Sequence, residues 1–258
     1  MCPTDPHAYF GPPAPWVDDY EEIHISVTFT WDLPKLPLLT ETWRPFGKVI
    51  IGGPAINGES DQPFQAGRYL KQGITITSRG CPNNCSFCMV RHGLIEFDDF
   101  PEGNIIQDNN VLACSDKHWR LVLSMLKKQK GIEFKGGLEK YRITPKVAED
   151  LRGLSIKTLW LACDQPQGVE PLRKAVTILK KAGFTQNHIY CYVLIGDDRA
   201  ENENRLKEVY NMGAMPFAQL FKDPAGVKEY SKDWKQFARL WSRPALYRKK
   251  MKVESCLI

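Results

Sequence analysis

Hydrophobic positions along this chain of 258 residues follow two alternating periods, one typical of strands and one typical of helices. Short β-rich apolar runs indicate six strands from residue 73 onward. We expect these strands at residues 74–77, 104–108, 132–135, 158–162, 189–195 and 215–221. Amphipathic stretches predict helices at residues 115–130, 144–153, 169–182 and 197–212, with a last one at 227–241. This alternation predicts an α/β fold of βαβ units with a parallel sheet.

The stretch before residue 73 follows a less regular pattern. Two short strands, at residues 23–29 and 49–51, flank a connector that contains several prolines. We expect these strands to extend the main sheet. The chain is thus expected to have three parts: an N-terminal segment (1–72), a core (73–225), and a C-terminal helix with a basic tail (226–258).

The composition of the chain indicates which class of protein it belongs to and in which cell compartment it is expected. No window holds eighteen uninterrupted apolar residues, which argues against a membrane-spanning helix. Residues 1–16 lack the basic start and apolar run of a signal peptide, so we expect a cytosolic protein without membrane association. A cytosolic location argues against a disulfide framework for the eight cysteines. Three clustered cysteines and scattered single ones instead indicate a metal site plus buried thiols, among them Cys114 and Cys191.

The formal net charge of +5 is mild, but basic residues crowd residues 239–252. Nucleic-acid binding and a solvated basic tail both explain this run. The charge therefore leaves a nucleic acid or nucleotide substrate open without identifying one.

Several chemically useful residues follow the ends of the expected strands. They are the cysteine cluster, Asp108, Gly136 with Gly137, Asp164 and Gly196. In parallel α/β folds, ligands bind at the carboxyl ends of the strands. This shared placement predicts one active site.

The cysteine cluster lies in the segment TSRGCPNNCSFC, residues 77–88, with the spacing C-x3-C-x2-C. Thiolates of Cys81, Cys85 and Cys88 can hold three irons of one cubane cluster, whereas electron-carrying ferredoxins use four cysteines. A cubane with three protein ligands keeps one iron open for a small molecule. Zinc is the alternative, with His92 as the fourth ligand, although no second pair of ligands is present.

This segment resembles the signature of the radical S-adenosylmethionine superfamily, in which an aromatic residue precedes the third cysteine, as Phe87 precedes Cys88. The resemblance extends over roughly residues 73–223 and is strongest to the barrel core of cobalamin-dependent radical enzymes and tRNA methylthiotransferases. Similar stretches are QDNN at residues 107–110, FKGGLEKYR at 134–142 and YVLIG at 192–196. The resemblance implies a partial, six-stranded parallel β/α barrel, a [4Fe–4S] cluster and bound S-adenosylmethionine.

The resemblance also implies roles for individual residues. Phe87 is expected near the adenine, and Gly136 with Gly137 near the methionine end of the cofactor, although each could instead serve packing or chain turning. Asp164 is expected at the ribose hydroxyls. Asp108 is expected to accept a hydrogen bond from the cofactor or to cap the following loop.

Two further candidates lie beside these positions. Glu139 is expected to form a charge pair with Arg142, either within the pocket or exposed. Cys163 is a candidate hydrogen-atom donor to a substrate radical; the alternative is a small buried residue.

The sequence departs from these relatives in informative places. Too few residues precede the core for a cobalamin domain, so we expect no cobalamin. Only Cys2 lies upstream of Cys81, which argues against the second cluster of methylthiotransferases. In place of the Glu-Ser and Pro-Gly-Glu segments of many relatives, this chain has Cys163-Asp164-Gln165 and Asp197-Asp198-Arg199.

Together these features predict an enzyme that cleaves S-adenosylmethionine reductively. The resulting 5′-deoxyadenosyl radical would abstract hydrogen from a substrate that the sequence does not identify. An external one-electron donor of the flavodoxin or ferredoxin type is implied. The alternative is a non-catalytic iron–sulfur or zinc module that binds nucleic acid.

Overall fold

The computed structural model describes residues 3, 6–53, 55–56, 69–90, 93–223 and 228–255, with the side chains of 253–255 left aside. The chain forms two compact units. Unit 1 comprises Met1–Lys71 and Lys222–Lys228, and unit 2 comprises Gln72–Phe221 and Glu229–Ile258. The chain therefore leaves unit 2 after its last strand, returns to unit 1, and then re-enters unit 2.

Unit 1 is a small βαβ arrangement. Its elements are β1 (Glu22–Ser26), the 3-10 helix η1 (Thr30–Lys35), α1 (Leu36–Trp43), the 3-10 helix η2 (Arg44–Phe46) and β2 (Lys48–Gly52). Strands β1 and β2 pair in parallel, with Glu22 opposite Lys48. In the returning segment, Lys222 Nζ lies 4.3 Å from the centroid of the Trp31 ring, and Trp31 itself stacks on Phe29.

The expectation that these two strands extend the main sheet is wrong. Within the described chain, β1 and β2 form a two-stranded sheet of their own. The physical reason is that their apolar side chains already have a core. The buried members of that core are Ile23, Ile25, Val27, Trp43 and Ala55.

Unit 2 is built on the predicted six-stranded parallel sheet, in the order β10-β9-β8-β7-β6-β3. The strands are β3 (Ile74–Thr75), β6 (Ile105–Ile106), β7 (Ile132–Phe134), β8 (Ile156–Ala162), β9 (Ile189–Ile195) and β10 (Met215–Leu220). The α/β class and the parallel sheet are thereby confirmed. The sheet is open, because β3 and β10 lie at its two edges.

Helices follow the strands as the amphipathic pattern predicts. They are α2 (Asp116–Leu126), α3 (Pro145–Arg152), α4 (Val169–Lys181), α5 (Arg199–Asn211) and α6 (Lys232–Trp241). Short 3-10 helices lie at η3 (Val111–Ala113), η4 (Lys140–Arg142) and η5 (Pro166–Gly168). The side chains of Ser115, Thr144, Asp198 and Ser231 cap α2, α3, α5 and α6.

A further helix, α7 (Pro244–Ser255), occupies the C-terminal segment for which only a basic tail was expected. Among the described residues, no helix is long and apolar enough to cross a membrane.

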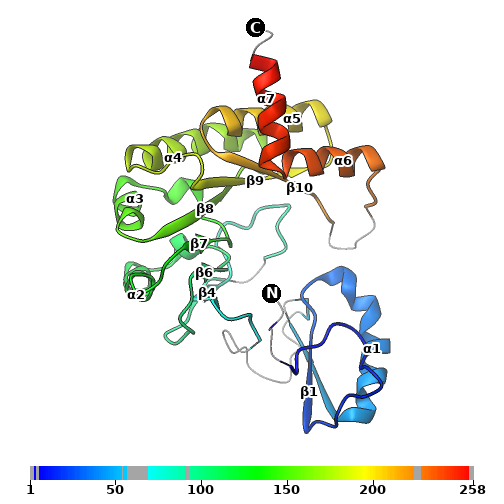
Figure 1. The fold of residues 1–258 in the computed structure, drawn as a ribbon. Coiled ribbons are helices and arrows are strands. Elements are labelled where there is room, and N and C mark those ends of the chain that lie inside the picture. The colour runs from blue at the N-terminus through cyan, green and yellow to red at the C-terminus, as the bar shows by residue number, and fades with distance from the viewer. Residues whose placement is uncertain are drawn as a thin grey trace. The chain divides into compact units, whose positions relative to one another are not determined.

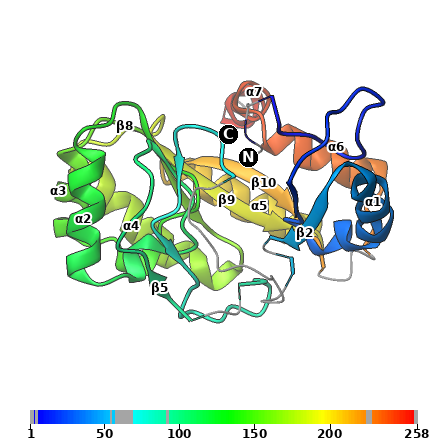
Figure 2. The same ribbon diagram turned by 90° about the horizontal axis from the view of Figure 1, so that it is seen from below.

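Side chains alternate between the two faces of the sheet. Along β9, buried positions alternate with half-buried ones. The buried face packs against the helices, which lie on one side because the strands follow each other in chain order (Figures 1 and 2). The other face carries Trp160, which stacks on Tyr190 and Tyr192 with ring centroids 4.7 and 4.4 Å away. Chemistry at the strand ends is thus positioned by a rigid, helix-backed sheet.

Candidate active site at the strand ends

The cysteine loop lies between two short strands of unit 2, β4 (Ser78–Arg79) and β5 (Ile95–Glu96). These strands pair antiparallel, so they close the base of the loop. The Glu96 carboxylate then accepts hydrogen bonds from the backbone N–H and hydroxyl of Ser115, at 2.5 and 2.7 Å. Ser115 is the cap of α2, so the loop is tied to the first helix of the sheet.

Within the loop, Cys81, Cys85 and Cys88 are all half-buried. The Cys88 N–H donates to the Cys85 carbonyl at 3.0 Å, which forms a tight turn, and the Val90 N–H donates to Cys88 Sγ at 3.4 Å. Burial raises the pKa of the Cys85 thiol, and the neighbouring thiols of Cys88 and Cys81 raise it further. Cys85 is therefore near enough to each of the other two thiols for their charges to affect it.

Asp108, which follows β6, binds the two residues that lead into this loop, Thr77 and Ser78. Its carboxylate accepts the Thr77 N–H at 2.7 Å, the Thr77 hydroxyl at 2.5 Å and the Ser78 hydroxyl at 2.8 Å. The side chain is 1% exposed, and burial raises its pKa while these hydrogen bonds oppose the rise. His118 Nε2 lies 3.1 Å from the Thr77 hydroxyl on the other side. In this structure Asp108 binds the chain that leads into the cysteine loop.

The two asparagines after Asp108 bind the loop itself. Asn109 Oδ1 accepts the Gly80 N–H at 2.9 Å, and Asn110 Nδ2 donates to Cys81 Sγ at 3.4 Å. The Asn110 amide also donates to Glu139 Oε2 at 2.7 Å, and Glu139 in turn accepts from Arg142 Nε at 2.7 Å. The predicted pair of Glu139 and Arg142 is therefore present, and it orients Asn110.

Asp164 brings the end of β8 into the same region. Its Oδ1 accepts the Leu194 N–H at 3.2 Å, which links the ends of β8 and β9. Lys140 Nζ donates to the Ala162 carbonyl at 3.2 Å. Asp164 raises and Lys140 lowers the pKa of Cys85, so both charges lie near the cysteine loop. Burial raises the pKa of Asp164 itself.

The predicted glycines differ in what surrounds them. A Cβ atom on Gly136 would lie 2.0 Å from the Asp108 carbonyl oxygen, so Gly136 allows the ends of β6 and β7 to approach. Gly137 has a φ of +100° and open space around it, which leaves its backbone accessible. At Gly196 a Cβ atom would meet the Tyr230 hydroxyl at 2.2 Å. Tyr230 therefore lies against the end of β9, where its hydroxyl donates to the Phe221 carbonyl at 2.7 Å.

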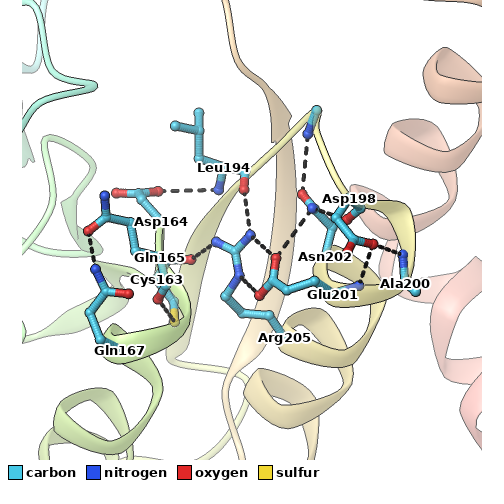
Figure 3. A network of polar contacts seen from close by, with 11 residues as sticks. Cys163, Asp164, Gln165, Gln167, Leu194, Asp198, Ala200, Glu201, Asn202 and Arg205 are labelled. Atoms are coloured by element: carbon cyan, nitrogen blue, oxygen red, sulfur yellow. Dashed lines mark hydrogen bonds and ion pairs between the residues drawn. The ribbon is translucent and has the colours of Figure 1, made fainter.

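Arg205 of α5 cross-links the ends of β8 and β9 (Figure 3). Its guanidinium donates to the Cys163 carbonyl at 2.8 Å and to the Leu194 carbonyl at 3.1 Å. It also binds both carboxylate oxygens of Glu201, each at 3.0 Å. The Asn202 side chain accepts the Gly196 N–H at 3.2 Å. These contacts fix the strand ends that carry Asp164 and Gly196.

The remaining candidates are placed as follows. Phe87 is half-buried in the cysteine loop. Cys163 is fully buried, with Sγ 3.9 Å from the Gln165 carbonyl oxygen, and burial raises its pKa to about 11. This environment matches the alternative reading of Cys163 as a small buried residue, because a hydrogen-atom donor must reach a substrate. His92 lies outside the described residues.

The donor set can be tested against an iron–sulfur cluster. In the part of the chain that the structure describes, no group of three or more His, Cys, Asp or Glu side chains is arranged to hold a metal ion. The chemistry of the loop nevertheless fits such a cluster, because thiolates ligate it and N–H donors to sulfur tune it. Val90 and Asn110 direct N–H groups at two of the three sulfurs. The Asn110 Oδ1 atom is buried and has no hydrogen-bond partner among the described residues.

Several residues of this region were not singled out in the sequence. Asn110 and Lys140 were visible only as parts of the similar stretches at residues 107–110 and 134–142, and Arg205 and Tyr230 carried no signal. Asn202 could have been found from its place four residues after the cap Asp198. The others act across strands that are distant in sequence, so only the sheet order brings them to the site.

Comparison with models of protein families and with curated proteins finds no match. The site is therefore interpreted from its own residues.

Proposed function

We propose that this chain is a radical S-adenosylmethionine enzyme, with a [4Fe–4S] cluster held by Cys81, Cys85 and Cys88. The observation that carries the proposal is the contact between the residues after β6 and the cysteine loop. Asn109 binds Gly80 and Asn110 binds Cys81, so the loop is held at the carboxyl edge of the parallel sheet. Ligands of parallel α/β folds bind at this edge, and a partial barrel would enclose them there.

The protein groups have distinct tasks in this proposal. When bound, the cluster supplies one electron that cleaves S-adenosylmethionine, and the resulting 5′-deoxyadenosyl radical abstracts hydrogen from a substrate. Burial raises the pKa of Cys85, and the nearby Lys140 ammonium opposes part of that rise, which favours the thiolate that would ligate iron. Asn110 orients Cys81, and Asp108 fixes the chain that enters the loop.

The cofactor would lie over the strand ends next to this loop. Gly137 offers accessible backbone there, and Phe87 offers an aromatic ring. Asp164 offers a carboxylate oxygen beside the end of β9. An external flavodoxin- or ferredoxin-type donor in the cytosol would reduce the cluster.

Anaerobic reconstitution of the full chain tests the proposal. We expect about four irons and four sulfides per chain, and a paramagnetic signal of the reduced protein that changes when S-adenosylmethionine is added. Chromatography should then detect 5′-deoxyadenosine after reduction with dithionite, even without the true substrate. Cys88→Ala should abolish the paramagnetic signal and the product, because a missing thiolate leaves the cluster poorly held.

Cys114→Ala is the matched control, because Cys114 is a half-buried cysteine outside the cluster loop. It should retain iron and product formation. One equivalent of zinc with no visible charge-transfer band would contradict the cluster assignment. An intact, reduced cluster that binds S-adenosylmethionine but yields no 5′-deoxyadenosine would contradict uncoupled cleavage.

A further inference from the structure

A half-buried lysine at the end of β8 has no ion-pair partner within the described ranges of the chain. Lys140 begins η4. Its Nζ donates to the Ala162 carbonyl at 3.2 Å and lies 5.0 Å from the centroid of the Tyr141 ring. A lysine ammonium has three donors, so the carbonyl uses only one of them. The ammonium can therefore bind an anion without losing a contact that it makes now.

Two other cations near this position already have carboxylate partners. Lys135, which follows β7, pairs with Glu133 at 3.2 Å, and Arg142 pairs with Glu139 at 2.7 Å. An anionic ligand would have to compete with a carboxylate at either of them. At Lys140 it would meet an ammonium whose neighbours are an uncharged carbonyl and an aromatic ring.

Asp164 is an acidic residue whose charge interacts with that of Lys140. Burial raises the pKa of the Asp164 carboxyl, and the Lys140 ammonium opposes part of the rise. The structure describes both side chains and gives no ion pair between them, and Asp164 Oδ1 instead accepts the Leu194 N–H at 3.2 Å. Residues 165–168, which follow Asp164, are uncharged. Asp164 thus reduces the positive potential at the ammonium without occupying its donors.

The ammonium is held in place near the cysteine loop. A Cβ atom on Gly168 would lie 3.3 Å from both Cε and Nζ of Lys140, so this glycine lets the lysine side chain pack closely against η5. The charge of Lys140 also reaches Cys85, where it opposes the rise in the thiol pKa that burial causes. A group bound by Lys140 would therefore lie near the proposed cluster.

We propose that Lys140 binds an anionic group of the substrate, so the substrate is a small molecule that carries a carboxylate or a phosphate. The inference rests on the function proposed above and names its substrate class. S-adenosylmethionine carries a sulfonium and an ammonium against a single carboxylate, so its net charge is positive and a lysine repels it overall. The same lysine attracts an anionic substrate, which it binds as a point charge.

Calorimetry on the full chain without iron tests the residue itself, with inorganic phosphate and acetate as probes. Lys140→Met should weaken the binding of at least one probe about fivefold or more, because methionine keeps the length of the side chain without its charge. Lys140→Arg should restore the affinity to within about threefold, since the charge returns. Unchanged affinity for both probes in Lys140→Met would overturn the proposal.

Lys135→Met is the matched control, because it removes the same charge from a lysine that already pairs with Glu133. It should leave both dissociation constants within about twofold of those of the unaltered chain. Equal weakening by Lys135→Met and Lys140→Met would overturn the site, because it would show a response to net charge alone.

The reconstituted enzyme then distinguishes the substrate from the cofactor as the source of the anion. Saturating S-adenosylmethionine should change the Lys140-dependent affinity for the probe by no more than about twofold, as expected for two separate sites. Displacement of the probe by S-adenosylmethionine would overturn the substrate assignment, because the carboxylate of the cofactor would then occupy Lys140. The comparison of variants needs no cluster, so this inference and the proposed function can fail separately.

Discussion

Replacement of Arg205 by methionine tests whether the strand ends depend on a buried charge network. Methionine has a similar length but cannot donate a hydrogen bond. Arg205 is 5% exposed, and its loss removes one donor from each of the carbonyls of Cys163 and Leu194 and two donors from the Glu201 carboxylate. Breaking a buried pair costs about 3–5 kcal/mol. Because the Glu201 side chain is 32% exposed, water recovers part of this cost.

We therefore expect Arg205→Met to lower the free energy of unfolding by about 3 kcal/mol. For a chain of this size, the melting temperature should fall by about 6–12 °C. Denaturant titration followed by circular dichroism measures the first quantity, and calorimetry measures the second. Hydrogen exchange should also increase at the ends of β8 and β9, because Arg205 binds both strands.

Arg173→Met is the matched control. Arg173 of α4 pairs with Glu170 and Glu208, but its side chain is 41% exposed. Exposed pairs contribute little, so this variant should lose no more than about 1 kcal/mol. Equal losses in the two variants, or a loss below about 1 kcal/mol for Arg205→Met, would refute the reasoning.

Three further predictions concern the strand ends. Gly136→Ala should destabilise the protein by about 2–3 kcal/mol in denaturant titration, because its Cβ atom would collide with the backbone after β6, whereas Gly137→Ala should cost only about 1 kcal/mol for its positive φ. Burial raises the pKa of Cys163 from 9.0 to about 11. The contribution of this protonated thiol to the free energy of unfolding is therefore fully present below pH 9 and is lost as the pH rises toward 11. The stability difference between the unaltered chain and Cys163→Ala should therefore shrink over that range, and a constant difference would contradict it. Asn110→Ala should lower the reduction potential of the reconstituted cluster in a potentiometric titration, because it removes an N–H donor to Cys81, and an unchanged potential would contradict this role.

The sequence predicted those parts of the fold that depend on local pattern. Strand β9 coincides with an apolar run of the sequence, and α2 begins directly after its cap Ser115, as expected. The same reasoning identified Asp108 and Asp164 as residues that follow strands. Each of these signals lies within a few positions of the element that it predicts.

The errors concern features that local pattern does not determine. The pairing partner of β1 is set by a core around Trp43, which the strand sequence does not contain. Helix α7 was not predicted because its many basic residues suggest a solvated tail, whereas its buried side chain Tyr247 attaches it to the fold. The bond from Asn110 to Cys81 joins residues 29 positions apart, so it follows only from the pairing of β3 with β6.

The division of the chain into units has a consequence for protein synthesis. Unit 1 begins the chain, but its last piece, Lys222–Lys228, follows the final strand of unit 2. On the ribosome, the N-terminal unit therefore stays incomplete until all six strands of the sheet in unit 2 have been made. A fragment that ends before residue 222 would leave Trp31 without the cation above its ring. We expect such a fragment to be cleaved faster by protease in unit 1 than the full chain, although every residue of its N-terminal part is present.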